Sequence, residues 1–403
     1  PRINEALCRL PGFGRLHPYV PGDMCSGALQ LIWELGEYLK EISGFAGITL
    51  QPAAGAHGEL TGIKLIRAYH QDRGNPRKRV LVPDTAHGTN PASSKLGGYD
   101  VVEIQSGPQG ILEADAVSQV MDDEVAALMI TNPNTLGLFE SHIGEIAGIV
   151  HRAGGLVYCD GANLNSMMGI ARPGDMGIDV MQFNLHKTFS TPHGGGGPGS
   201  GPVGVADALM DFLPVPQVEK TPRGFAITED RPKSIGRVKS FYGQFAVMVR
   251  AYVYIREMGA AGLKKASEMA VLNANYIRAR LADTYHLPYS QRPMHEVVFS
   301  DKNLEELDVT TLDVAKRLLD YGFHPPTVYF PLVVHGALMI EPTETESPET
   351  LDEFIDAMKK IVEEAKTDPE LVRTSPHNTV VRRLDEVKAA RDPILTWKPP
   401  TSS

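Results

Sequence analysis

Cysteine is scarce in this chain of 403 residues. The three cysteines are Cys8, Cys25 and Cys159, and no two of them form a Cys-x-x-Cys pair. A set this sparse provides neither a disulfide framework nor a zinc site, and no cluster of histidines and carboxylates has the spacing of metal ligands. We therefore expect small buried thiols in a reducing compartment and no bound metal.

Long apolar runs and an excess of positive charge are missing as well. No stretch approaches about 18 uninterrupted apolar residues, which argues against a membrane span, and the first residues lack the pattern of a secretory signal. Lys and Arg number 39 against 49 Asp and Glu, a formal net charge of −10, which argues against nonspecific binding to nucleic acid. No Gly-x-Gly-x-x-Gly follows a strand and no Gly-x-x-x-x-Gly-Lys-Ser/Thr occurs, which disfavours dinucleotide and nucleoside-triphosphate binding.

An alternation of strand-like and helix-like segments fills the first half of the chain. A proline-rich arm over 11–22 precedes a helix that ends at Gly44, and a second helix is expected from near His57 to Gly74. Short β-branched runs then predict strands at 79–82, 100–104, 127–131, 156–159 and 180–185. With helical patterns between them, the alternation predicts an α/β domain with a mostly parallel sheet covered on both faces. Such a sheet binds ligands at the carboxyl ends of its strands.

The character of the sequence changes after Gly204. We expect a polar connection over 214–232, two long helices over 241–258 and 260–282, strands at 296–299, 328–332 and 337–341, and helices at 311–321 and from Ser347 onward. About 150 residues per domain gives two to three domains as a prior. The prediction is an arm and helix over 1–45, a large α/β domain over 46–240, linking helices over 241–290, a smaller α+β domain over 291–370 and a tail over 371–403.

Two side chains at expected strand ends carry the chemical argument. Asp160 follows an apolar strand, and Lys187 follows the next one, 27 positions later. A carboxylate there can pair with a protonated pyridine nitrogen, and an amine can form a Schiff base with an aldehyde. Each alone is more often a helix N-cap or a surface lysine. The spacing leaves room for one crossover and a return strand, so neighbouring parallel strands would aim both groups at one crevice.

Two glycine-bearing loops and one histidine add to this pattern. The loop 53–59 opens a helix and is either a phosphate cradle or a tight turn. The segment 193–201 combines many glycines with Pro198, which favours a close-approach loop over a flexible linker. His87 follows the strand at 79–82, where its ring would either lie flat on a cofactor or serve as a hydrogen-bonded loop residue.

Several motifs are now in register from Asn4 to the final helix. They are His186-Lys187-Thr188-Phe189 with its glycine-rich continuation, Asp160-Gly161-Ala162-Asn163, Ala86-His87-Gly88-Thr89-Asn90-Pro91-Ala92-Ser93, Arg172-Pro173-Gly174-Asp175 and the stretch Glu341 to Ser347. Together they resemble glycine dehydrogenase (decarboxylating), the P-protein of the glycine cleavage system. The match is similar to its catalytic C-terminal half, or to the second subunit of the split bacterial form.

The resemblance implies a fold-type-I pyridoxal-phosphate enzyme with a large domain and a smaller C-terminal α+β domain. It implies that Lys187 is the Schiff-base lysine, that Asp160 partners the pyridine nitrogen, and that His87 stacks on the ring. Further cofactor-binding residues would be Ala162 on the other face of the ring, Gly55, Ala56 and His57 at the phosphate, Thr135 near the phenolic oxygen, and His186. Many relatives carry Asn-Ser-Gly and a Gln in the phosphate loop, where this chain has Ala53-Ala54-Gly55 and His57, so backbone contacts to the phosphate are expected.

The implied reaction is decarboxylation of glycine with transfer of the aminomethyl group to the lipoyl arm of H-protein. The implied partners are lipoylated H-protein and P-protein subunit 1 in an α2β2 assembly, in the cytoplasm of a bacterium or archaeon. His193 and Arg237 are candidates for binding the substrate carboxylate, and the loop 194–201 is expected to close over the phosphate, from the same or a neighbouring chain. Relatives of the split type also carry residues upstream of Asn4, including a Ser-Cys-Thr-Met-Lys-like stretch beside the active site.

Two other functions stay open on the sequence. One is a different reaction on the same fold, such as that of an amino-acid decarboxylase or an aminotransferase. The other is a scaffold subunit without cofactor, against which the joint presence of Lys187 and Asp160 argues.

Overall fold

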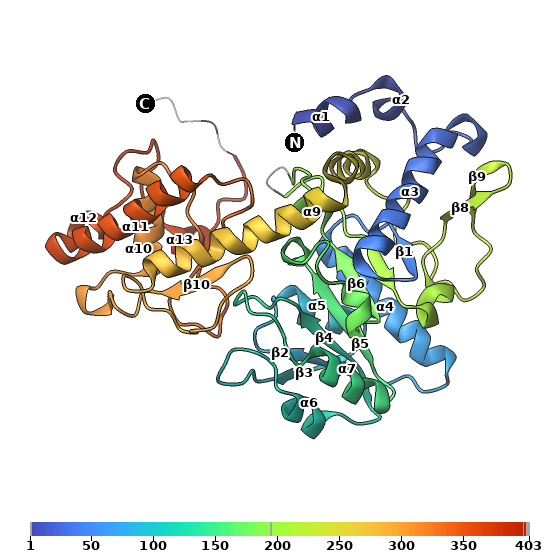
Figure 1. The fold of residues 1–403 in the computed structure, drawn as a ribbon, viewed down its shortest axis with the longest axis horizontal. Helices are drawn as coiled ribbons and strands as arrows, with labels where there is room; N and C mark the ends of the chain where they lie inside the picture. The colour runs from blue at the N-terminus through green and yellow to red at the C-terminus, as the bar shows by residue number, and fades with distance from the viewer. Residues whose placement is uncertain (1, 194–195, 398, 400–403) are drawn as a thin grey trace.

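A seven-stranded sheet forms the centre of the larger part of the molecule (Figure 1). The computed structural model describes residues 2–193, 196–397 and 399. The strand order is β1 (Gly47–Thr49), β7 (Val203–Val205), β6 (Val180–Phe183), β5 (Leu156–Gly161), β4 (Val125–Thr131), β2 (Arg79–Pro83) and β3 (Asp100–Ile104). The five strands from β6 to β3 are parallel, whereas β7 runs antiparallel to both of its neighbours. The predicted mostly parallel α/β sheet is therefore confirmed.

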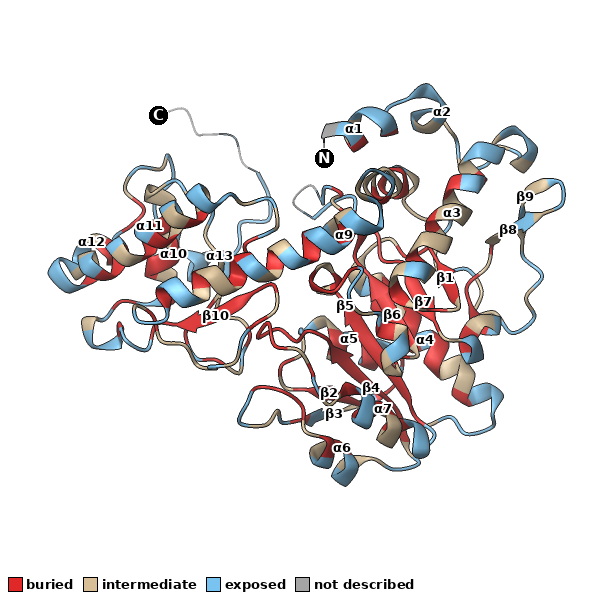
Figure 2. Cartoon of the chain, in the orientation of Figure 1, coloured by how far each residue is buried: buried red, intermediate tan, exposed pale blue. Residues whose placement is uncertain are grey.

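The strands are apolar because both faces of the sheet are covered. Every residue of β4 and β5 is buried (Figure 2). Successive residues of β4 pack into different clusters, Leu128 on one face and Ala127 and Met129 on the other. The helices between the strands are α4 (Gly55–Asp72), α5 (Thr89–Leu96), α6 (Ala114–Val120) and α7 (Ile143–Arg152). Burial on both faces explains why these strands are continuous apolar runs in the sequence.

The segment before the sheet is more helical than predicted. It contains α1 (Arg2–Cys8), α2 (Pro11–Gly14), the 3-10 turn η1 (Gly22–Met24) and α3 (Ser26–Ser43). The expected extended arm over 11–22 is wrong in its first part, since Pro11 begins a short helix and Phe13 packs against the Phe245 ring at 6.1 Å. The predicted end of α3 is confirmed, because Gly44 has the left-handed conformation at φ 80° that closes a helix.

The polar connection over 214–232 contains a hairpin that the sequence analysis missed. Strands β8 (Gln217–Thr221) and β9 (Gly224–Thr228) pair antiparallel, and Phe225 lies against Trp33 at 5.6 Å. Then α9 (Phe245–Leu281) runs from the large sheet to the C-terminal part of the chain (Figure 1). Two helices were predicted here, and the chain does break helical geometry between them, at Gly259 with φ 59° and ψ −177°.

A second, smaller sheet lies in the C-terminal part. Its antiparallel strands are β10 (Val297–Ser300), β12 (Ala337–Ile340) and β11 (Thr327–Val328). Helices α10 (Thr311–Asp320), α11 (Pro348–Thr367) and α12 (Pro369–Arg373) accompany it, and α13 (Glu386–Arg391) lies in the exposed tail. The strand predicted over 328–332 is wrong beyond Val328, because the chain turns at Tyr329 with φ 57°. The helix predicted from Ser347 onward is confirmed as α11, and the Ser347 hydroxyl caps it by accepting the Thr350 N–H at 3.2 Å.

Short elements complete the described part of the chain. They are η2 (Leu164–Ser166), η3 (Pro173–Met176), α8 (Leu185–Thr188), η4 (Asp207–Phe212) and η5 (Glu305–Leu307). No helix among the described residues is both long and apolar enough to cross a membrane.

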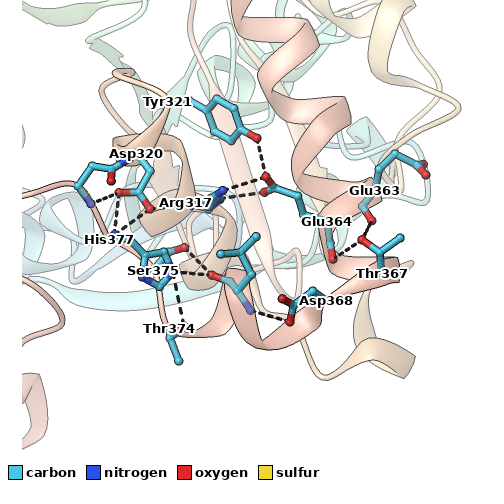
Figure 3. A network of polar contacts seen from close by, with 12 residues as sticks. Arg317, Asp320, Tyr321, Glu363, Glu364, Thr367, Asp368, Thr374, Ser375 and His377 are labelled. Carbon is cyan, nitrogen blue, oxygen red and sulfur yellow. Dashed lines mark hydrogen bonds and ion pairs between the residues drawn. The ribbon is translucent and has the colours of Figure 1, made fainter.

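A polar network ties α10, α11 and the following segment together (Figure 3). Arg317 donates two parallel hydrogen bonds to Glu364, both at 2.8 Å, and the Tyr321 hydroxyl donates to the same carboxylate at 2.7 Å. Asp320 accepts backbone N–H groups of His377 and Asn378, each at 2.7 Å. The Arg317 guanidinium holds the pKa of Glu364 below its ordinary value. These hydrogen bonds hold the segment that follows α12 against the end of α10.

Candidate active site

A cavity of about 1080 Å³ lies at the carboxyl ends of the large sheet, with its opposite wall formed by the C-terminal part of the chain. Of the nine residues that the sequence predicts to be catalytic or to bind the cofactor, eight line this cavity. They are Gly55, Ala56, His87, Thr135, Asp160, Ala162, His186 and Lys187. The structure therefore brings these eight to one place, as expected for residues that follow parallel strands.

Asp160 and Lys187 enter the cavity from neighbouring strands. Asp160 pairs in register with Gln182 across β5 and β6, and Lys187 lies one short turn beyond β6, in α8. Asp160 is buried and accepts hydrogen bonds from the Ala162 N–H at 3.0 Å, the Asn90 amide at 3.0 Å and the Gln182 amide. Three donors on one carboxylate fix its orientation at the sheet end.

Gln182 orients Asp160, and the sequence analysis missed it. Its carbonyl oxygen accepts the Tyr158 hydroxyl at 2.5 Å, which leaves its NH₂ group to face Asp160. Burial raises the pKa of Tyr158 well above its usual range, so this hydroxyl stays a donor. A lone amide within the apolar strand 180–183 was the available signal, because buried polar groups need partners.

Glu59 forms a second buried carboxylate behind Asp160. It accepts hydrogen bonds from Thr89 at 2.9 Å and from Asn90 and Ser93 at 3.2 Å. Burial, and next the nearby charge of Asp160, raise the pKa of Glu59. The Asn90 amide thus bridges the two acids, which makes α5 part of the support for the site.

The start of α4 is shaped for an anion. Its N-cap is Ala54, whose methyl group cannot accept a hydrogen bond, so the N–H groups of the first turn remain available. Backbone approaches closely here, because a side-chain carbon on Gly201 would overlap the Ala54 carbonyl, and the Gly201 N–H bonds Pro52 O at 3.0 Å. Ala54, Gly55 and Ala56 line the cavity. A helix N-terminus with free donors and a positive dipole end suits a phosphate group.

His57 is the one predicted cofactor-binding residue that does not line the cavity. The ring instead accepts the Ala53 N–H at 3.1 Å and so supports the loop from behind. Burial lowers the pKa of His57, which favours the neutral ring that accepts this bond.

Aromatic and hydroxyl side chains line the region above Asp160. The His87 ring meets the Phe330 ring at 5.5 Å and an interplanar angle of 64°, and its Nδ1 lies 2.9 Å from the Thr89 hydroxyl. Thr135 donates to Thr85 O at 2.5 Å. His87 thus has an aromatic neighbour from the C-terminal part of the chain.

The rings of His186 and His193 lie in contact, with centroids 4.4 Å apart and planes tilted by 34°. Burial, His193 and Lys187 together lower the pKa of His186 to about 4, so its ring is neutral. Of the two carboxylate-binding candidates, His193 lines the cavity, whereas Arg237 is wrong for this place because it pairs with Glu229 outside it. Residues 194–195 of the predicted closing loop lie outside the described residues.

The opposite wall carries an acidic cluster that the sequence analysis also missed. Glu296 precedes β10, Glu341 follows β12, and both line the cavity. One carboxylate oxygen of Glu296 and one of Glu341 each lie 3.8 Å from Nε2 of the fully buried His295. An acidic residue beside a buried apolar strand was the signal in both cases.

The fold and these side chains together define a class. A crystal structure of glycine decarboxylase (P-protein) of the glycine cleavage system in inhibitor-bound form superposes with a TM-score of 0.76 at 21% identity, covering 89% of this chain and 82% of that one. The Escherichia coli cysteine desulfurase CsdA has a TM-score of 0.67 at 15% identity, covering 90% of each chain. Residues 61–196 match the aminotransferase class-V family. The protein has the fold of the fold-type-I pyridoxal-phosphate enzymes.

Sequence similarity narrows this class to one family. Residues 266–382 match the family described as glycine dehydrogenase, C-terminal domain. A protein of Caldanaerobacter subterraneus subsp. tengcongensis named "Probable glycine dehydrogenase (decarboxylating) subunit 2" is 60% identical over 398 residues, covering 98% of this chain and 82% of its own length. A protein of the same name from Alkaliphilus oremlandii is 57% identical over 399 residues, with 99% and 82% covered. The chain belongs to the glycine dehydrogenase (decarboxylating) subunit 2 family.

Proposed function

We propose that this chain decarboxylates glycine and transfers the remaining aminomethyl group to the lipoyl arm of H-protein, with pyridoxal 5′-phosphate as cofactor. The observation that carries the proposal is the meeting of Lys187 and Asp160 in one cavity, at the ends of adjacent strands. A scaffold subunit has no use for this pair. Membership of the family named above makes glycine the preferred substrate over other amino acids.

The residues of the cavity fit the cofactor at both of its ends. The free N–H groups at the start of α4 would hold the phosphate, and the buried Asp160 carboxylate would hold a proton on the pyridine nitrogen. Lys187 would supply the amine that attaches the cofactor covalently. When bound, pyridoxal phosphate supplies an electron sink for the pair left on the α-carbon as carbon dioxide departs.

The remaining cavity residues would position and shield the reactants. His87 and Ala162 would contact the two faces of the ring, and Thr135 its phenolic oxygen. The His186 ring is neutral and contacts the tilted ring of His193, so His186 would add no charge beside Lys187. The proposal includes a companion subunit 1 in an α2β2 assembly and a cytoplasmic location, which the name "subunit 2" and the bacterial origin of the relatives support.

The test combines a spectrum with an assay. The chain, together with its companion subunit, should bind pyridoxal phosphate with visible absorbance and release carbon dioxide from glycine in the presence of lipoylated H-protein, but not from a panel of other amino acids. Lys187→Ala should abolish the borohydride-reducible attachment of the cofactor, whereas Lys95→Ala, an exposed lysine on α5, should not. Equal turnover of another amino acid would disprove the assignment to glycine.

A further inference from the structure

Glu296 and Glu341 form a pair because of the register of the small sheet. Val297 pairs with Ile340 at the end of the antiparallel β10–β12 ladder, so the two glutamates are the next residues on facing strands. Directly opposed residues of antiparallel strands have Cβ atoms about 5 Å apart. A carboxylate oxygen of each and a ring nitrogen of His295 all lie within 4.8 Å of one another. Two acids are thus held together at the wall that faces the large sheet.

The pair has few partners that would stabilise two negative charges. Glu296 is 3% exposed and, among the described residues, accepts only the Asn163 amide, at 3.4 Å; Glu341 accepts the Asn165 amide at 3.2 Å. Within the described part of the chain, neither carboxylate forms an ion pair with a lysine or arginine. Burial and the charge of Glu341 raise the pKa of Glu296 well above its ordinary value, and burial raises that of Glu341 as well. The pair therefore holds a proton more readily than separate glutamates do.

The charged groups that face the pair come from both parts of the molecule. The Lys187 ammonium on α8 lowers the pKa of both glutamates, though less than burial raises it, and Glu344 raises that of Glu341. Burial lowers the pKa of His295 to about 3, and neither of its ring nitrogens has a hydrogen-bond partner among the described residues. His295 and His186 are therefore neutral rings that cannot act as acids at neutral pH, whereas the carboxyl pair can.

The two glutamates differ in access to water. The side chain of Glu341 is 45% exposed and lines the cavity, whereas that of Glu296 is 4% exposed. A proton can therefore reach Glu341 from the cavity water and pass to the buried Glu296 beside it. An acid that must regain its proton after each turnover requires this difference in access to water.

The proposed reaction takes up one proton per turnover. The α-carbon uses the electron pair left by carbon dioxide to form a C–S bond with one sulfur of the lipoyl disulfide. The S–S bond breaks, its electron pair passes to the second sulfur, and that sulfur needs a proton to become a thiol. The reactants are thus zwitterionic glycine, the disulfide and one proton, and the products are carbon dioxide, an aminomethyl ammonium group bound to sulfur and one thiol. The glycine carbon is oxidised and the disulfide is reduced.

We propose that the Glu296–Glu341 pair is the acid that protonates the departing lipoyl sulfur. This inference rests on the proposed function and adds a residue pair from the C-terminal part of the chain to its machinery. Glu296→Gln and Glu341→Gln keep the size of each side chain and remove the acid. Glu346→Gln, on the same segment but outside the cavity lining, is the matched control.

The experiment uses the chain assembled with its companion subunit, loaded with cofactor and glycine, and mixed with oxidised lipoylated H-protein. Thiol formation in the parent protein and in Glu346→Gln should slow as pH rises, because the pair loses its proton. Glu296→Gln should slow it about 100-fold and remove this pH dependence, while the change in visible absorbance on adding glycine persists. Without cofactor, the infrared band of a protonated carboxyl group at neutral pH should weaken in Glu296→Gln and Glu341→Gln.

Several results would overturn the inference. If both variants keep the rate and pH profile of the parent, the pair is not the acid. If thermal unfolding shows that Glu296→Gln does not fold, the rate and pH profile of Glu341→Gln alone decide whether the pair is the acid. Loss of activity on chelation, together with a divalent metal bound by the parent but not by Glu341→Gln, would make the cluster a cation site instead. No absorbance change with glycine in the parent would refute the proposed function, and the infrared band would still report whether the pair holds a proton.

Discussion

Asp160 and Gln182 are register partners on β5 and β6, and the Gln182 amide donates to the Asp160 carboxylate. The pairing that builds the sheet thus also orients the acid that would face the cofactor. Because Tyr158 fixes the other end of the Gln182 amide, the orientation is set by the sheet rather than by a flexible loop.

Asp160→Asn should abolish most of the decarboxylation while the cofactor still binds. The amide has the shape of the carboxylate but cannot carry the charge that stabilises a protonated pyridine ring, so we expect a loss of about 100-fold or more in kcat. Visible absorbance measures cofactor binding and labelled carbon dioxide measures turnover. Asp211→Asn, at an exposed position, is the control, and near-normal turnover by Asp160→Asn would remove Asp160 from this role.

Gly201→Ala should weaken cofactor binding more than it weakens the fold. Its methyl group would overlap the Ala54 carbonyl and displace the start of α4. Gly36→Ala, within α3 and with nothing within 4 Å of the added carbon, should instead raise stability by about 0.5–1 kcal/mol. Titration with pyridoxal phosphate and thermal unfolding of both variants compare the effects. Unchanged affinity in Gly201→Ala would show that the α4 start does not hold the phosphate.

Glu364→Gln should destabilise the C-terminal part at neutral pH by about 2 kcal/mol, because the variant loses a charge-assisted pair with Arg317. Arg317 depresses the folded pKa of Glu364 below its ordinary 4.5. The stabilisation is therefore complete above the unfolded value and is lost as pH falls through the folded one. Urea unfolding at pH 7 and in acid should show the difference from the parent protein shrinking.

The neighbouring residue supplies the control for this pair (Figure 3). Glu363 is 69% exposed and pairs with Lys366 on the surface, so Glu363→Gln should change stability by less than about 0.5 kcal/mol. An equal loss in both variants would contradict the importance of the Arg317 pair.

Native protein should present one thiol to a thiol reagent. Cys25 is partly exposed, whereas Cys8 and Cys159 are buried. Burial raises the pKa of Cys159 to about 12, which removes the reactive thiolate at neutral pH. Cys25→Ser should abolish the reaction until denaturant is added. Rapid modification of two or more thiols in the folded protein would contradict the burial of Cys159.

The large sheet could be predicted because its strands carry their own signal. A parallel strand buried on both faces is a continuous apolar run, and the aspartate that the sequence singled out, Asp160, is the next-to-last residue of β5. The β8–β9 hairpin has no such signal, because its residues are all intermediate or exposed and form no continuous buried apolar run. Its position depends on contact with α3, for example Phe225 with Trp33, which the local sequence does not encode.

The candidate site also contains residues that the sequence could place and residues that only the folded chain brings together. Eight of the predicted residues line the cavity. They lie at the ends of strands of the large sheet or at the starts of the helices that follow, and parallel strands end at a common edge. The His57 side chain stays out of the cavity lining because its ring accepts the Ala53 N–H, and the expected backbone contacts to the phosphate do not depend on that ring. Glu296 and Glu341 could not be paired from sequence, since only the antiparallel register of β10 and β12 brings them together.

One straight helical segment sets the distance between the two walls of the cavity. After Gly259, α9 contributes Leu263 and Ala266 to the core beneath the large sheet and Ile277 and Leu281 to the core of the small one. A single residue inserted between these pairs would rotate the small sheet by about 100° and shift it by about 1.5 Å along the axis. The position of Glu296 and Glu341 relative to Lys187 therefore depends on the number of residues in this helical segment. An insertion or deletion there would be far more disruptive than most substitutions.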